Sequence, residues 1–370
     1  MQTSAELDEL DRMLVTALQA APRADWRRVG RALDVDASTA ARRWARLTDA
    51  GLAWLSCHPS VGPGLAPLVA FIEIDCAPGL LRQVAARIAA DSHVFTVEHV
   101  TGARDLLVTA TFQDQAALAR YLGFRLGALE GVAATRSQIA TMVHVEGSHW
   151  RLDRLPERRR ALLLDRAPAE RSAGAASAGT PDTADLALFT ALSEDCRMPA
   201  AGLAERTGLS PTTVRRRLAR MQAERALVFR CEVARFLSGW PVSVTLWCAA
   251  PPGDVPKIAA QLIGTRETRL CASLSGPHNV MATVWLRSVE DIQAYEARLV
   301  ARFPELVIAD RAIALWPLKL GGHILDPYGR HVRAVPVALW EDSAAATAEE
   351  SLLAPFRPAG EGGPAARLGV

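Results

Sequence analysis

The chain has 370 residues, half of them hydrophobic, and a formal net charge of +2 at pH 7. This length exceeds one ordinary single-core domain and predicts two to four small folded domains. The near-neutral total excludes an overall positive field as the basis of nucleic-acid binding, so any such binding must come from locally clustered arginines.

The six cysteines are widely spaced, with no CxxC pair and no Cys/His cluster that has the spacing of zinc ligands. We expect reduced thiols packed in the interior, and neither a metal nor a cofactor: Cys57, Cys76, Cys196, Cys231, Cys248 and Cys271. No basic-then-apolar signal segment opens the chain, and no run of about 18 apolar residues follows. These features predict a soluble cytoplasmic protein without a membrane partner.

An internal repeat organises the chain. Asp11 recurs as Asp185, and identical residues continue at this constant offset of 174 without a gap: Leu18 and Leu192, Arg23 and Arg197, Thr39 and Thr213, Arg42 and Arg216, Arg43 and Arg217, Arg46 and Arg220, Cys57 and Cys231, Pro67 and Pro241, Gly102 and Gly276, Ile139 and Ile313. The constant register, with matching apolar patterns between these positions, predicts two homologous halves of about 145 residues.

Each half opens with three predicted helices. Apolar residues at helical spacing predict the first over residues 7–20 and 184–192, and the second over 26–33 and 200–207. The turn that follows contains Asp34-Val35 in one copy and Gly208-Leu209 in the other, both suited to a positive φ. Asp36 and Ser210 are good N-cap residues for the third helix.

The third helix carries a pattern typical of DNA recognition. Its apolar face holds Ala40, Trp44 and Leu47, matched by Val214, Leu218 and Met221, so hydroxyls and guanidiniums face away or lie at the flank. The candidate DNA-binding residues are Ser38, Thr39, Arg42, Arg43, Arg46, Ser210, Thr212, Thr213, Arg216, Arg217 and Arg220. Such groups suit major-groove contacts and phosphate binding. The alternative, a merely solvated helix surface, is weakened because the whole three-helix pattern occurs twice.

A short apolar segment follows each third helix, at residues 51–55 and 225–229, as expected of a wing or hinge strand. LDELDRMLVTALQ, GLSPTTVRRRLARM and the strand after it resemble the amino-terminal unit of the leucine-responsive/asparagine-regulator (Lrp/AsnC) family. The second copy resembles it more closely. The first has Asp34, Asp36 and Ala37 in place of the usual glycine and Ser-Pro, and in the second Arg225 stands where Gly51 sits, so equal DNA affinity of the two units does not follow.

The rest of each half predicts strand, helix, two strands, helix, strand, over residues 67–76, 79–90, 93–101, 105–112, 114–127 and 132–145 and again 174 residues later. This order is that of a ferredoxin-like βαββαβ unit, an α+β fold. Since helices cover only one face of such a sheet, the other face needs a cover. The resemblance implies a second sensing domain packed sheet to sheet, and we expect an intrachain pseudo-dimer that forms homo-oligomers through its sensing domains.

A glycine turn joins the second and third strands of each sensing unit. The resemblance places an amino-acid effector pocket at such turns, which gives as candidate effector residues Thr101, Gly102, Arg104, Asp105, Ser275, Gly276, His278 and Asn279. Exposed amides of the turn suit a carboxylate and Asp105 suits an ammonium group. The alternative is an ordinary hairpin turn. Asn279 in place of the acid leaves open two unlike pockets or one inactive pocket.

The predicted division is therefore residues 1–60 and 183–234 as winged helix-turn-helix domains, 66–146 and 240–320 as ferredoxin-like sensing domains, and 147–182 as a linker. That linker includes the charged RLDRLPERRRALLLDR, which is expected to be a solvated connector, and RSAGAASAGTPDTAD, which is expected to be flexible. The extension 321–370 has strand-like pieces without a predicted place, and its end from 341 is expected to be disordered.

These features predict a transcriptional regulator that binds double-stranded DNA at successive half-sites while an effector shifts their spacing. An enzyme is the first alternative, because siroheme decarboxylases are similar to this family and also occur as fused halves. Their His-Asn-Tyr-x-Arg-like stretch is lacking here, where His99 and His278 are the only candidates. A scaffold that no longer binds DNA is the second alternative.

Overall fold

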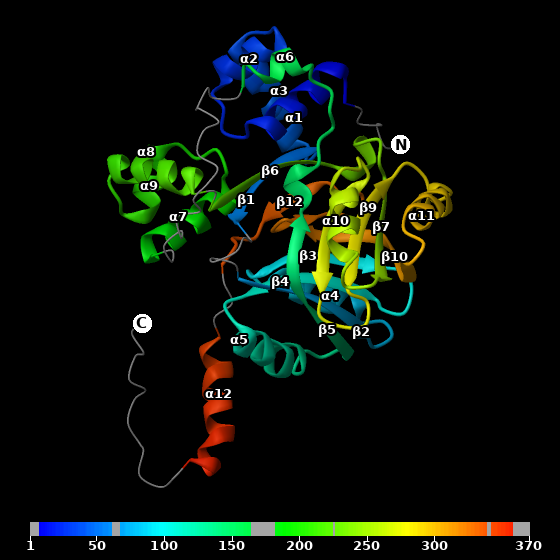
Figure 1. Cartoon of the computed structure of the whole chain (residues 1–370). Coiled ribbons are helices and arrows are strands. Elements are labelled where there is room, and N and C mark those ends of the chain that lie inside the picture. The colour runs from blue at the N-terminus through cyan, green and yellow to red at the C-terminus, as the bar shows by residue number, and fades with distance from the viewer. Residues whose placement is uncertain (1–6, 61–66, 164–181, 225, 339–341, 358–370) are drawn as a thin grey trace.

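The computed structural model describes residues 7–60, 67–163, 182–224, 226–338 and 342–357. Figure 1 shows two groups of helices, α1 to α3 and α7 to α9, on either side of the paired strands β1 and β6. The remaining strands form the body of the molecule beside them. Each predicted repeat is thus present as a helical unit followed by an α+β unit.

The helical units have the predicted three-helix order. Their elements are α1 (Glu9–Ala20), α2 (Trp26–Leu33), α3 (Ala37–Asp49) and β1 (Ala53–Pro59), then α7 (Thr183–Glu194), α8 (Ala200–Thr207), α9 (Pro211–Ala223) and β6 (Leu227–Val233). Both first helices begin at an aspartate capping box, with Asp8 or Asp182 as the N-cap. Asp34 (φ 63°) and Gly208 (φ 72°) end the second helices in the left-handed conformation, which confirms the predicted turns.

The two helical units are joined by a pseudo-symmetric contact. Strands β1 and β6 pair antiparallel about the equivalent residues Ser56 and Arg230. The equivalent arginines Arg23 and Arg197 each reach into the opposite unit: Arg23 donates to the carbonyls of Cys196 (2.5 Å) and Met198 (3.1 Å), and Arg197 to those of Pro22 (2.6 Å) and Ala24 (2.7 Å). These contacts fix the relative position of α3 and α9.

Both sensing units have the predicted βαββαβ order. The first contains β2 (Leu68–Cys76), α4 (Leu81–Ala89), β3 (Val94–Val100), β4 (Leu106–Phe112), α5 (Gln115–Arg120), the π-helix η1 (Tyr121–Leu126) and β5 (Val132–Val145). The second contains β7 (Val242–Ala249), α10 (Val255–Ile263), β8 (Thr268–Leu274), β9 (Val280–Leu286), α11 (Asp291–Arg302) and β10 (Val307–Leu320). Their strand orders, β5–β2–β4–β3 and β10–β7–β9–β8, are the same and are ferredoxin-like.

The two sensing sheets close on each other. The long strands β5 and β10 each extend into the other half: Ala140 on β5 pairs with Leu274 on β8, and the equivalent Ala314 on β10 pairs with Val100 on β3. Because β10 also pairs with β7, eight strands form a closed ring. The helix-free faces turn inward and enclose an apolar core that includes Phe71, Trp247 and Met281. The expected intrachain pseudo-dimer is confirmed.

The solvated connector predicted for residues 151–166 is wrong for residues 151–163, the part that the structure describes. Trp150, Leu152, Leu155 and Leu163 are each at most 6% exposed and belong to the core of the first helical unit. The backbone of Leu152 donates to the Gln19 side chain at 2.9 Å. The short helix η2 (Gly147–His149) precedes this segment, and α6 (Glu157–Arg160) lies within it. The leucines bury apolar surface that α1 and α2 leave open. The predicted flexible segment after residue 163 lies outside the described residues.

The extension after residue 320 is more ordered than expected. Its strands β11 (His323–Leu325) and β12 (His331–Ala334) extend the sheet beyond β10, and α12 (Ser343–Leu353) and η4 (Ala354–Phe356) follow. The backbone of His331 donates to the Gly51 carbonyl at 2.8 Å, and that of Val337 to the Ser193 hydroxyl at 2.9 Å. Arg120 on α5 pairs with Glu349 on α12 at 2.9 Å. The extension thus contacts both helical units, and the disorder predicted from residue 341 is wrong for 342–357; residue 341 and residues 358–370 lie outside the described part.

All six cysteines are free thiols, five of them buried, as predicted. Burial raises the pKa of Cys57 and Cys231 well above its ordinary value, which keeps both thiols protonated. In the described part of the chain, no helix has the length and apolar character needed to cross a membrane.

The packing of the segment after η2 predicts a specific stability difference. Leu155→Ala should lower the free energy of unfolding by about 2–4 kcal/mol, since it opens a cavity in the core of the first helical unit. Leu162→Ala is the matched control, because Leu162 is 46% exposed and its truncation should cost less than about 0.5 kcal/mol. Thermal and urea unfolding measure both. Equal effects of the two variants would mean that residues 150–163 do not pack as described.

Candidate functional site

The outer faces of α3 and α9 are open to solvent. Ser38 and Arg42 are exposed on α3, as are Thr212 and Arg216 on α9, while the equivalent Thr39 and Thr213 are half-buried. Among the described residues, neither Arg42 nor Arg216 has an ion-pair partner within 4 Å, so both guanidiniums remain available. This pair of exposed helices, each following a tight turn, has the geometry of major-groove recognition elements.

Four of the predicted DNA-contacting arginines form ion pairs within their own helical unit. Arg43 pairs with Asp8 (2.6 Å) and Asp11 (2.9 Å), and Arg46 pairs with Asp11. The second unit repeats this arrangement, because Arg217 pairs with Asp182 (2.9 Å) and Asp185 (2.8 Å), and Arg220 with Asp185 (2.5 Å). Asp11 and Asp185 are nearly fully buried, so these ion pairs neutralise carboxylates that would otherwise be buried and uncompensated.

The predicted outward direction of Arg46 and Arg220 therefore needs correction. Both side chains bend back to the first helix of their unit, although about half of each side chain stays exposed. The reason is the capping box, which places an aspartate beside the third helix at the start of the first. Each unit thus keeps one unpaired guanidinium of the predicted set, Arg42 in the first and Arg216 in the second.

Two of the predicted hydroxyl contacts have a capping role. Ser210 is the N-cap of α9 and accepts from the Thr213 backbone at 3.1 Å, and the two side-chain oxygens lie 2.8 Å apart. Asp36 occupies the same position before α3 but makes no side-chain cap bond. The start of α9 is consequently better fixed than that of α3.

Arg215 was not among the predicted site residues. It is exposed on α9 beside Arg216, and its Nη2 lies 3.4 Å from the Thr212 hydroxyl. Its equivalent in the first unit is Ala41, so the identity pattern of the repeat could not reveal it. The run Arg215-Arg216-Arg217 was itself the available signal. The second unit therefore presents one more exposed guanidinium than the first at this face.

The two glycine turns join the halves. Thr101 and its equivalent Ser275 each use the side-chain oxygen to accept from the backbone of the other half, at Ile313 and Ile139, both at 2.9 Å. The Asp105 carboxylate accepts from the Cys76 backbone at 2.7 Å. At the equivalent position, the Asn279 amide exchanges two bonds with the backbone of Ala250. Asn279 therefore fills the same structural place as Asp105.

The other predicted effector residues differ in burial and in the contacts they make. Arg104 is 7% exposed, pairs with Glu73 (3.0 Å) and Asp310, and stacks over Trp247 at 4.3 Å. Gly102 and Gly276 lie at the turns with positive φ, and His278 is half-buried. Most polar groups of these turns are engaged in folding contacts, so the hairpin interpretation accounts for them.

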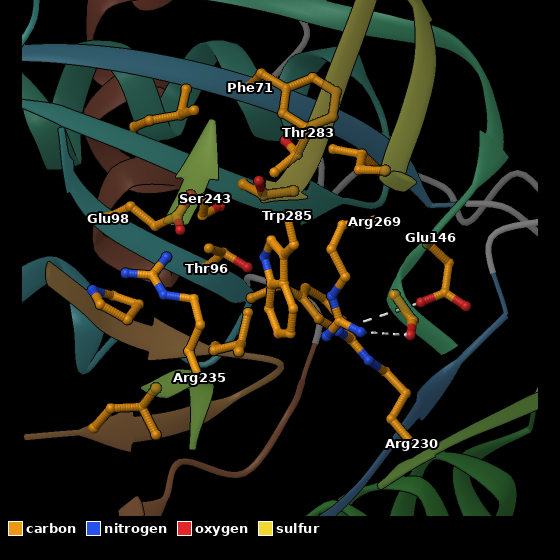
Figure 2. Close-up of a pocket in the computed structure, with 18 of the residues that line it drawn as sticks. Phe71, Thr96, Glu98, Glu146, Arg230, Arg235, Ser243, Arg269, Thr283 and Trp285 are labelled. Atoms are coloured by element: carbon orange, nitrogen blue, oxygen red, sulfur yellow. Dashed lines mark hydrogen bonds and ion pairs between the residues drawn. The ribbon is translucent and has the colours of Figure 1, made fainter. Parts of the chain in front are cut away.

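The structure also contains a cavity that was not predicted. About 150 Å³ in volume, it lies where the two sensing sheets meet the β1–β6 pair. Figure 2 shows the labelled residues around it, among them Glu98, Arg235, Arg269 and Trp285. The wall combines apolar side chains with hydroxyls and charges: Phe71, Leu107, Met281, Thr96, Thr109, Thr283 and Ser243 belong to it. The sequence held no signal for this site, because its residues come from segments of both halves.

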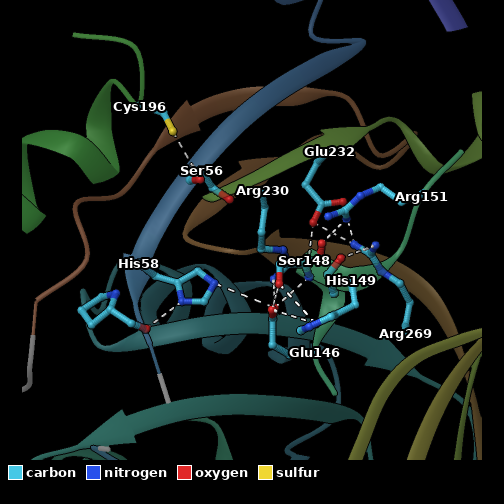
Figure 3. A network of polar contacts seen from close by, with 12 residues as sticks. Ser56, His58, Glu146, Ser148, His149, Arg151, Cys196, Arg230, Glu232 and Arg269 are labelled. Atoms are coloured by element: carbon cyan, nitrogen blue, oxygen red, sulfur yellow. Dashed lines mark hydrogen bonds and ion pairs between the residues drawn. The ribbon is translucent and has the colours of Figure 1, made fainter. Parts of the chain in front are cut away.

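A buried ionic network borders the cavity (Figure 3). Glu232 pairs with Arg230 at 2.5 Å and with Arg269 at 2.7 Å, and Arg269 stacks on Trp285 at 4.2 Å. Burial would raise the pKa of Glu146, but Arg230, His58 and hydrogen bonds from Ser148 bring it to about 2. Burial lowers the pKa of His58, so this imidazole is neutral at pH 7. The network is therefore internally compensated.

His99 and His278, the histidines considered for an enzyme, lie apart from this cavity's lining. His99 is on β3 opposite Trp316, and His278 is in the second glycine turn. Among the described residues, no group of three or more His, Cys, Asp or Glu side chains is arranged to hold a metal ion.

Known proteins match this chain in domain, sequence and structure. The model of the AsnC-type helix-turn-helix domain matches residues 7–48 and 182–222, and that of the Lrp/AsnC ligand binding domain matches residues 69–149. An uncharacterised HTH-type transcriptional regulator of Pyrococcus horikoshii is 31% identical over 140 residues, which are 37% of this chain and 88% of that protein. A counterpart from Pyrococcus abyssi matches with the same figures.

Among solved structures, the siroheme decarboxylase NirDL aligns with a TM-score of 0.55 at 10% identity, over 95% of this chain and 100% of that one. At this identity the likeness is one of fold, and it extends over nearly the whole of both chains. The domain matches and the relatives carry the assignment: this chain belongs to the Lrp/AsnC family of DNA-binding transcriptional regulators, in a form in which one polypeptide contains two helix-turn-helix domains.

Proposed function

We propose that the chain binds operator DNA with α3 and α9 together, each helix entering one major-groove half-site. The observation that carries this proposal is the pair of exposed helix faces with free Arg42 and Arg216 at equivalent positions. Arg215 and Thr212 add contacts on α9 only, so we expect the second unit to bind more strongly than the first. The DNA site is accordingly expected to contain two unequal half-sites.

The spacing between the half-sites is set within a single chain. The β1–β6 ladder and the exchanged bonds of Arg23 and Arg197 connect the helical units directly. In this proposal, a small-molecule effector acts on the sensing domains and changes the position of the two helices. At the glycine turns, an effector can contact only groups that are not engaged in folding contacts. Such groups include the backbone of Gly102 and Gly276 and the His278 ring.

Removal of the free arginines should weaken DNA binding without unfolding the protein. The double variant Arg42→Ala/Arg216→Ala should lose at least tenfold in affinity, and the slope of log K against log salt should fall by about one for each phosphate contact removed. The measurement is fluorescence anisotropy on a fragment that the wild-type chain selects from genomic DNA. Arg82→Ala is the control, because it removes an exposed charge from α4 in the sensing domain. Equal affinity of the double variant and wild type would refute the assigned faces.

The arginines that pair with the buried aspartates should affect the stability of the protein. Arg43→Ala or Arg217→Ala leaves a buried aspartate with one partner fewer, and each should reduce the stability of its unit by about 1–3 kcal/mol. Arg42→Ala and Arg216→Ala should leave stability within about 0.5 kcal/mol of wild type. Urea unfolding compares the four variants. If Arg43→Ala or Arg217→Ala is as stable as wild type, the ion pairs of that arginine do not support the fold.

We further propose that the chain is not an enzyme. The cavity of about 150 Å³ matches a ligand near the size of benzene, and a tetrapyrrole is far larger. The residues His99 and His278 do not line this cavity. A siroheme decarboxylase remains the second candidate, because NirDL shares the fold over nearly the whole chain.

Tetrapyrrole binding separates the two candidates. The test adds iron uroporphyrin III to the purified protein. If the protein has no tetrapyrrole site, the absorbance spectrum of the mixture should equal the sum of the two separate spectra. Serum albumin, a promiscuous binder of such molecules, serves as the positive control for the assay. A saturable shift of the main absorbance band at one equivalent per chain would favour the siroheme-decarboxylase candidate.

A further inference from the structure

The cavity where the sensing sheets meet the β1–β6 pair contains a carboxylate without a partner. Glu98 on β3 is only 9% exposed, and among the described residues its carboxylate has neither a hydrogen-bond donor nor an ion-pair partner within 4 Å. Burial raises its pKa, against the opposing effect of Arg235 and Arg269. A buried carboxylate without a donor is costly, so this group has unused capacity for a cationic ligand.

A guanidinium with spare donors enters the same cavity. Arg235, in η3 (Arg235–Leu237) directly after β6, donates from Nη2 to the Ala314 carbonyl at 3.2 Å, its only side-chain hydrogen bond within the described part of the chain. A guanidinium has five N–H donors, so several remain for an anionic group. Arg235 and Glu98 lie too far apart to pair directly, yet both are part of the same wall (Figure 2).

The other charges around the cavity are already matched. Glu232 holds both Arg230 and Arg269, and Glu146 is held by Ser148 and Arg230. The remaining wall near Glu98 is apolar or hydroxylic, with Phe71, Leu107 and Met281 nearly fully buried. The unmatched groups are therefore one acid and one base, in a wall whose remaining residues near Glu98 are apolar or hydroxylic.

The charged groups depart from the internal repeat. At the offset of 174, Glu98 corresponds to Ala272, Arg269 to Phe95, Arg230 to Ser56 and Arg235 to Val61. In two identical halves, each charge would occur twice around the pseudo-symmetry axis. Fusion of the halves in one chain has allowed the cavity to become asymmetric, because Glu98 and Arg235 each occur only once around it.

We propose that this cavity binds one small zwitterion per chain, with its ammonium group on Glu98 and its carboxylate on Arg235. A cavity of about 150 Å³ accommodates a molecule near the size of benzene, which has six heavy atoms, so compounds of roughly six to eight heavy atoms fit. This site is distinct from the glycine turns, whose acid Asp105 caps the Cys76 backbone.

The position of the cavity connects it to the helical units. Trp54 on β1, Val233 on β6 and Arg235 immediately after β6 all line it, so a bound molecule contacts both strands that carry the helix-turn-helix units. The regulatory consequence, a change in the placement of α3 and α9, rests on the proposed DNA-binding function. Binding itself does not depend on that function, and the two can be tested separately.

Isothermal titration calorimetry of the full chain tests the site with L-valine, β-alanine and γ-aminobutyrate as probes. We expect at least one zwitterion to bind at one equivalent per chain. Isobutylamine and 3-methylbutanoate, which each keep one charge of L-valine, provide a test that needs no variant. Each should bind at least tenfold more weakly than L-valine if L-valine is bound, because each loses a charge-assisted hydrogen bond.

Variants locate the bound zwitterion. Glu98→Gln and Arg235→Gln should each weaken its binding at least tenfold, whereas Asp105→Asn, which keeps an acceptor for the Cys76 backbone, should bind as wild type does. Thermal unfolding checks the fold. Glu98→Gln should melt at or above the wild-type temperature because it removes a buried carboxylate that no donor among the described residues satisfies.

Three outcomes would overturn the proposal. The first is no binding of any of the three zwitterions, and the second is unchanged binding by Glu98→Gln and Arg235→Gln. The third is binding that Asp105→Asn reduces or removes, which would place a site at the glycine turns. DNA anisotropy on the same samples separates the two proposals: intact DNA binding with no zwitterion bound defeats only the cavity site, and loss of DNA binding with the zwitterion bound defeats only the operator function.

Discussion

Every other feature of this protein depends on how the two homologous halves cover each other's open sheet faces. A four-stranded ferredoxin-like sheet with helices on one side leaves an apolar face that a single half cannot bury. Here β5 crosses to β8 and β10 crosses to β3, which closes a ring of eight strands without a free edge between the halves. The glycine turns lock the same junction through Thr101 and Ser275. The helix-turn-helix units are thereby held on one common support.

Within each helical unit, the ion pairs divide the arginines into two groups with different tasks. Arg43, Arg46 and their equivalents compensate Asp11 and Asp185, which the capping boxes place in near-complete burial. Arg42 and Arg216 are left to solvent and to DNA. One side of the third helix of each unit therefore stabilises the fold and another side is open for recognition. The aspartate at the start of the first helix determines which arginines belong to each side.

Duplication within one chain has a further physical consequence. A homodimer must place every charge twice about its symmetry axis, and an acid at the centre would face its own copy. In this chain the equivalents of Glu98 and Arg269 are Ala272 and Phe95, so each of these interior charges occurs only once. The likeness of the whole chain to NirDL is one of fold. It does not determine what the interior binds, because shared fold and shared ligand are separate properties.

The sequence by itself determined the local elements and their repetition. Apolar periodicity, the capping aspartates and the offset of 174 located both helical units and both βαββαβ units, since these signals arise between neighbours along the chain. Only the tertiary structure decided which arginines are free, because the partner Asp11 lies over thirty residues from Arg43 and Arg46. It also decided that Leu152 and Leu155 pack in a core and that Glu98 and Arg235 share a cavity. Those contacts join residues from distant segments, and neither composition nor periodicity records which distant segments meet.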